Sequence, residues 1–165
     1  MKKKAIWIAA VAVLVVAVLV VGLIVRQRQT ARQVDGAVTL KNGGKTVQIP
    51  LGELDQMAFS GETVNGKGER ATHDYHGVPL KTLLEDQQVD LGAVSAVTVT
   101  AADQFSADYT IDEINEEGKV WLAVRVDGQS VEGVDPGTPG AQMVVFGDPN
   151  SKRNVRCLTE IETKP

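Results

Sequence analysis

The sequence predicts a β-rich α+β domain with short connecting helices, preceded by one N-terminal transmembrane helix. Three observations indicate this architecture. Residues 5–25 form an unbroken apolar run. Along residues 36–165, short stretches alternate apolar and polar residues, which is the period of a half-buried strand. Helical spacing of apolar residues is confined to brief segments between these stretches, so the helices are expected to connect strands.

The apolar run at residues 5–25 predicts a membrane anchor. Its 21 residues, AIWIAAVAVLVVAVLVVGLIV, would span about 31 Å as a helix, close to the ~30 Å hydrocarbon core of a bilayer. A cleaved signal peptide is the alternative, but its apolar core has about 7–15 residues and leads into a small-residue cleavage site. We therefore expect residues 1–4 to be a cytoplasmic head, residues 5–25 an uncleaved signal anchor, residues 26–35 a tether and residues 36–165 the folded domain.

Charge is distributed unevenly along the chain. Residues 1–32 hold six of the 17 basic residues and no acidic residue, and residues 33–165, with 11 basic against 21 acidic residues, carry −10. Such an acidic domain is a poor candidate for nucleic-acid binding, which needs clustered cations at the phosphates. Basic residues on the two sides of the run nearly balance, but a short basic head typically precedes an exported domain. The expected location is the cell membrane, single-pass, with the C-terminal domain extracytoplasmic.

The first half of the domain contains a recognisable hairpin signal. Apolar residues 38–40 and 46–49 flank Asn42-Gly43, which predicts two paired strands. Leu51, Leu54 and Met57 follow Pro50 at helical spacing and predict a short helix over residues 51–57. Residues 60–70 are rich in glycine and charge, so they are expected to form a loop or a loosely paired hairpin.

The second half predicts two short helices among further strands. A helix should start at Pro79, with Leu80, Leu83 and Leu84 on one face, and another should run from Asp112, its cap, to Glu117 before Gly118. The remaining strands are predicted at residues 97–99, 105–111, 120–126 up to the Asp127-Gly128 turn, 143–146 and 155–161.

Histidine and cysteine are too few for most kinds of catalytic or metal site. His73 and His76 could bind one metal from one helix face, but Pro79 follows closely and disfavours a helix before it. Two solvated imidazoles in a loop are the favoured interpretation. The single cysteine, Cys157, excludes an internal disulfide and a zinc site built on several thiolates. It could be a reactive thiolate beside Arg153 and Arg156, but in a terminal strand a small buried hydrophobe is more usual.

One basic cluster stands out in the acidic domain. Lys152, Arg153 and Arg156 follow a turn at residues 147–150 and could present cations to an anion, although a solvated turn is the alternative. The sequence offers no recognisable Ser-His-Asp arrangement and no glycine-rich phosphate-binding loop.

Five motifs in order resemble the oxidoreductase molybdopterin-binding domain family, which has the sulfite-oxidase fold. They cover about residues 75–162, more than half of the chain. The motifs are Tyr75-x-Gly77-Val78-Pro79-Leu80 with Leu83-Leu84, Val97-Thr98-Val99 through Asp103-x-Phe105, Leu122-Ala123 with Asp127-Gly128, Gly137-x-Pro139 with Val144-Val145-x-Gly147, and Val155-Arg156-Cys157-Leu158-Thr159-Glu160-Ile161-Glu162.

The departures from this family bear on function. A cysteine upstream of the Gly-Val-Pro-Leu motif ligates molybdenum in the family, whereas this chain has no cysteine before Cys157. Gln142 falls near a family arginine, and Arg156 keeps a cation where the family has lysine. The resemblance thus implies a small membrane-anchored member without the molybdenum-ligand cysteine. If it binds a molybdopterin at all, Lys152, Arg153 and Arg156 would lie near the phosphate.

We therefore expect a membrane-anchored extracytoplasmic domain that binds a small anionic ligand or an envelope protein without catalysis or cofactor. One alternative is a molybdopterin-dependent oxidoreductase. The other is an accessory subunit of an envelope redox or transport complex.

Overall fold

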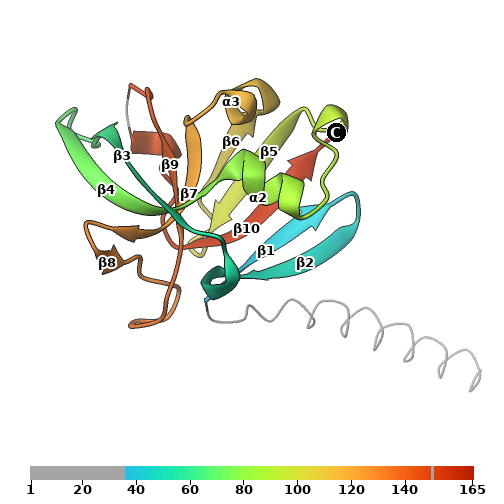
Figure 1. Cartoon of the computed structure of the whole chain (residues 1–165), viewed down its shortest axis with the longest axis horizontal. Helices are drawn as coiled ribbons and strands as arrows, with labels where there is room; N and C mark the ends of the chain where they lie inside the picture. The colour runs from blue at the N-terminus through green and yellow to red at the C-terminus, as the bar shows by residue number, and fades with distance from the viewer. Residues whose placement is uncertain (1–35, 150) are drawn as a thin grey trace, which may run out of the picture. The chain divides into compact units, whose positions relative to one another are not determined.

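A computed structural model describes residues 36–149 and 151–165, without the side chain of Ser151 (Figure 1). The predicted head, anchor and tether, residues 1–35, lie outside the described residues. Within the described part, no helix is long and apolar enough to cross a membrane.

Two five-stranded sheets make up the described domain. The first has the order β2-β1-β10-β5-β6, in which β1 and β10 are parallel and the other pairs antiparallel. The second has the order β3-β4-β7-β8, with β9 also paired to β7. The strands are β1 (Ala37–Asn42), β2 (Lys45–Pro50), β3 (Met57–Val64), β4 (Arg70–Pro79), β5 (Ala96–Ala101), β6 (Ser106–Thr110), β7 (Val120–Val126), β8 (Gln129–Ser130), β9 (Gln142–Val145) and β10 (Leu158–Lys164).

Short helices connect these strands, as the sequence predicted. The α-helix α2 (Leu80–Asp86) follows β4 and α3 (Ile111–Asn115) follows β6, and both are visible in Figure 1. The described residues also form three single-turn 3₁₀ helices, η1 (Leu51–Glu53), η2 (Leu91–Ala93) and η3 (Ser151–Arg153).

The main core combines side chains of both sheets with one face of α2. Leu80, Leu83 and Leu84 of α2 are at most 1% exposed, in agreement with the predicted helix face. The strand residues that pack with them include Val38, Leu40, Val97, Val99, Leu122, Met143 and Ile161. Burial of this contiguous apolar set is the main favourable contribution to folding.

Strand β7 of the second sheet is buried on both faces along residues 120–124, which positions the candidate site. Leu122 of β7 faces the main core, whereas its neighbours Trp121 and Ala123 face a second cluster on the outer side of the sheet. In that cluster the Phe59 ring stacks on Trp121, with 3.9 Å between ring centroids, and on Tyr75 at 5.1 Å. The outer face of the sheet therefore carries a cluster of packed aromatic side chains.

The structure confirms the first hairpin and corrects the segment after it. The predicted helix at residues 51–57 is wrong beyond η1, because Met57 already begins β3 opposite Gly77 and is half exposed. Of the two alternatives for residues 60–70, the paired hairpin is right, since the β3–β4 register continues to Val64 opposite Arg70.

Two boundaries in the second half also differ from the prediction. Thr110, not Asp112, caps α3, because Thr110 and Glu113 form a reciprocal capping box in which each side chain accepts from the backbone N–H of the other. The last strand begins at Leu158, not at Val155. The preceding segment is not extended, since Cys157 has a positive φ of 48°.

Candidate functional site

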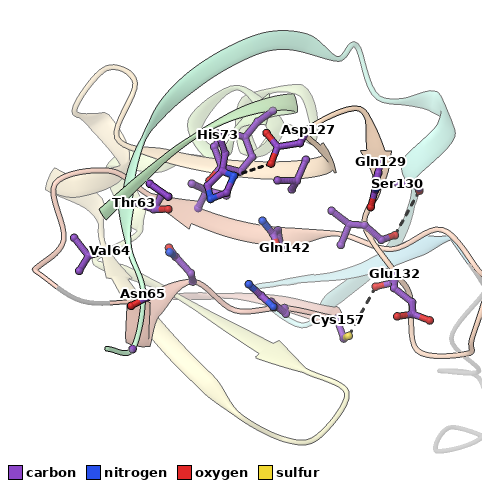
Figure 2. Close-up of a pocket in the computed structure, with 18 of the residues that line it drawn as sticks. Thr63, Val64, Asn65, His73, Asp127, Gln129, Ser130, Glu132, Gln142 and Cys157 are labelled. Carbon is purple, nitrogen blue, oxygen red and sulfur yellow. Dashed lines mark hydrogen bonds and ion pairs between the residues drawn. The ribbon is translucent and has the colours of Figure 1, made fainter. Parts of the chain in front are cut away.

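A cavity of about 790 Å³ lies over the outer face of the second sheet (Figure 2). Its walls come from the end of the β3–β4 hairpin, the β7–β8 turn with the residues that follow it, β9, and residues 154–157. These segments are far apart in the sequence. Pairing of β7 with both β4 and β9 brings them together.

Strand alternation decides which residues of β4 reach the cavity. Ala71, His73 and Tyr75 line it, whereas Thr72 and His76 do not. Both histidines lie in β4, so the expectation that they occupy a loop is wrong. Because a strand places residues three apart on opposite faces, they do not share a metal site. The described residues contain no group of three or more His, Cys, Asp or Glu that could hold a metal ion.

His73 forms a fixed pair with Asp127 at the cavity wall. Its Nδ1 is 2.7 Å from Asp127 Oδ2, and the other carboxylate oxygen accepts the backbone N–H of Asp74 at 3.0 Å. Hydrogen bonding from His73, together with that backbone N–H, holds the pKa of Asp127 below its usual value. Since Asp127 is ionised, the proton lies on Nδ1, and Nε2 of a neutral His73 is a hydrogen-bond acceptor.

Tyr75 joins the cavity to the aromatic cluster beneath it. Its side chain is 3% exposed and packs against Phe59 and Phe146. Burial raises the pKa of Tyr75, and the charges of Asp127 and Arg156 shift that pKa in opposite directions. Asp127 and Arg156 therefore both lie within electrostatic range of one phenol.

The structure separates the three predicted basic residues. Arg156 is exposed and lines the cavity, whereas Lys152 and Arg153 are not among the lining residues. Arg153 instead donates two hydrogen bonds to Glu113, at 2.9 and 2.8 Å, and two to Asp148. The hydrogen bond from Arg153 is the main reason why the pKa of Glu113 falls to about 2.

Cys157 also lines the cavity, which the sequence did not predict. It is half-buried, and its Sγ donates a long hydrogen bond of 3.8 Å to the backbone oxygen of Glu132. The expectation of a strand hydrophobe is wrong, because Cys157 lies just before β10 in a left-handed backbone conformation. Figure 2 shows Cys157 and Glu132 on one side of the cavity and His73 and Asp127 on the other.

The lining fits a molybdopterin poorly. The pterin carries an anionic phosphate, but Arg156 is the one Lys or Arg among the described lining residues, and three carboxylates, Glu69, Asp127 and Glu132, accompany it. Arg153, which could have added a cation, is already engaged by two carboxylates. An anion in this cavity would meet more like charge than opposite charge.

The fold as described defines a β-rich class of domain with two sheets and few helices. Neither a protein-family model nor a curated protein sequence matches the chain. Among solved structures, the sulfane dehydrogenase SoxCD from Paracoccus pantotrophus is similar, with a TM-score of 0.62 and 14% sequence identity. The match covers 77% of this chain and 37% of the SoxCD chain, so this chain spans well under half of that protein. At this identity the likeness concerns the fold, and it supports the predicted sulfite-oxidase-like fold.

Proposed function

We propose that this chain is a membrane-tethered, extracytoplasmic domain that binds a small ligand in the cavity and does not catalyse a reaction on it. The observation that carries the proposal is the cavity itself. Its volume, about 790 Å³, lies in the range of small-molecule sites. Arg156, Gln129 and Gln142 line it and make no side-chain hydrogen bond to another described residue, so they are available to a ligand. Residues 5–25 would provide the tether.

The arrangement of the possible nucleophiles favours binding over catalysis. A hydroxyl or thiol nucleophile needs a base within hydrogen-bond reach. In the described structure His73 bonds to Asp127, Cys157 to the Glu132 carbonyl and Ser130 to the Val131 carbonyl. None of these hydrogen bonds joins the imidazole to a nucleophile.

The experiment is native mass spectrometry of the full chain, extracted in mild detergent from membranes of its native host. We expect a bound small molecule on the wild type. Ala71→Trp should remove it, because Ala71 lies on the cavity side of β4. Thr72→Trp is the matched control, since Thr72 is also exposed but does not line the cavity. A wild type without any bound species, or equal retention by both variants, would contradict the proposal.

A molybdopterin-dependent oxidoreductase is the second candidate. The structural likeness to SoxCD and the position of Arg156 in the cavity support it, and the charges of the lining oppose it. This candidate predicts molybdenum in the purified protein and its loss in Arg156→Gln.

A further inference from the structure

Charged side chains of both signs line the cavity, namely Arg156 and the carboxylates Glu69, Asp127 and Glu132. The His73–Asp127 pair lies on one wall, and Cys157 lies on the other (Figure 2). Arg156 immediately precedes Cys157 in the chain and lines the same cavity. A ligand in the cavity can therefore contact the Asp127 carboxylate with its His73 partner and, elsewhere in the lining, the cation of Arg156.

Arg156 is suited to bind an anionic group. A guanidinium presents five N–H donors in a planar fork that matches a carboxylate. Arg156 forms no salt bridge with any described residue, unlike Arg153, which two carboxylates occupy. Its donors are therefore not committed within the described domain.

The His73–Asp127 pair is suited to a cationic hydrogen-bond donor. Because Nδ1 of His73 faces Asp127 at 2.7 Å, Nε2 is the ring nitrogen left for a ligand; in the neutral tautomer with the proton on Nδ1 it accepts a hydrogen bond, and the adjacent carboxylate supplies negative charge. Of the other two lining carboxylates, Glu69 already accepts a hydrogen bond at Oε2 from Asn65 Nδ2 at 2.6 Å, and Glu132 lies on the Cys157 side of the cavity (Figure 2). An ammonium group satisfies both the acceptor and the charge.

We infer that the ligand is a small zwitterion, of the class of amino acids and short peptides, whose carboxylate binds Arg156 and whose ammonium group binds the His73–Asp127 pair. This inference rests on the proposed ligand-binding function. An anion without a positive charge would offer nothing to the Asp127 carboxylate, and a cation without an anionic group would leave the donors of Arg156 without an acceptor. A zwitterion offers a partner both to Arg156 and to the His73–Asp127 pair, and a cavity of about 790 Å³ has room for more than a single small residue.

The test uses the common L-amino acids and the glycyl dipeptides as probes. They are screened by thermal shift on the full chain in detergent, and each hit is measured by calorimetry. We expect at least one probe to bind saturably. Its methyl ester and its N-acetyl derivative should each bind about 10- to 100-fold more weakly, the usual effect of losing a charge-assisted hydrogen bond. These derivatives need no variant, so misfolding cannot imitate the result.

Two pairs of variants then test which side chains bind the carboxylate and the ammonium group of the probe. Arg156→Gln and His73→Gln should each weaken binding of the zwitterion about 10-fold or more. Arg125→Gln and His76→Gln, both exposed positions outside the cavity lining, should leave it unchanged. If no probe binds, or if Arg156→Gln binds the probe as well as the wild type, the inference is overturned. If mass spectrometry shows a native ligand that is not zwitterionic, the inference is overturned and the proposed function stands. If no native ligand is seen and no probe binds, the inference and the proposed function both fail.

Discussion

Removal of the Arg153 charge should destabilise the domain and loosen one wall of the cavity. The guanidinium binds Glu113 with both Nη atoms and Asp148 with Nε and Nη2. The backbone oxygen of Arg153 also accepts the Tyr109 hydroxyl, and residues 154–157 of the cavity wall follow directly. Arg153→Met keeps most of the volume and removes every one of the side-chain hydrogen bonds.

The magnitude follows from the burial of the partners. The side chains of Arg153, Glu113 and Asp148 are 29%, 20% and 12% exposed. Removing one partner of a fully buried ion pair costs about 3–5 kcal/mol, and exposed pairs contribute about 0–1 kcal/mol. For this partly buried network we expect Arg153→Met to lower the free energy of unfolding by about 2–3 kcal/mol.

The assay is urea unfolding of the full chain in detergent, followed by tryptophan fluorescence. Trp121 packs in the aromatic cluster and reports on the domain, and Trp7→Phe removes the second tryptophan of the chain. Arg125→Met is the control, because Arg125 is exposed and forms no salt bridge with a described residue. Adding Glu113→Gln to Arg153→Met should restore part of the loss by removing an uncompensated carboxylate. Equal stability of Arg153→Met and Arg125→Met would refute the reasoning.

Three further changes test other parts of the fold by the same assay. Acidification should lower the free energy of unfolding. The pKa of Glu113 is lowered to about 2, so the stabilising contribution of its carboxylate is complete above the usual pKa of about 4.5 and is lost as the pH falls toward 2. Arg153→Met should flatten this part of the pH–stability profile, and an unchanged profile would contradict it. Gly77→Ala should cost about 3 kcal/mol or more, because the added Cβ would lie 2.0 Å from the Leu122 carbonyl oxygen. Gly52→Ala, with no atom within 4 Å of its Cβ, should stay near wild type, and similar losses for both would be inconsistent with the close approach. Phe59→Ala should cost about 2–3 kcal/mol by removing the ring stacked on Trp121 and Tyr75, whereas Phe105→Ala, about half exposed, should cost well under 1 kcal/mol; equal costs would argue against the aromatic cluster beneath the cavity.

Local patterns predicted most of the secondary structure. The Asn42-Gly43 turn marked the first hairpin, and the spacing of Leu80, Leu83 and Leu84 marked α2. These signals depend on residues close in sequence. Errors occurred where a longer-range partner decides the conformation, as for Met57, which pairs with Gly77 in the β3–β4 hairpin.

The candidate site was much less predictable, because its contacts are long-range. Arg153 was predicted as a cation available to an anion, but Glu113, 40 residues away, occupies it. His73 was predicted to be solvated, but Asp127, 54 residues away, binds it. Asp127-Gly128 was predicted only as a turn; it ends the strand next to β4, and the carboxylate that it brings to the edge of the cavity was not predicted.

We propose that this fold serves ligand binding here, and not molybdenum chemistry. The most direct test is elemental analysis for molybdenum in the full chain purified from membranes of its native host, with folding verified by circular dichroism. We expect no molybdenum above the blank in the folded protein. A near-stoichiometric amount that is lost in Arg156→Gln and retained in Arg125→Gln would contradict it.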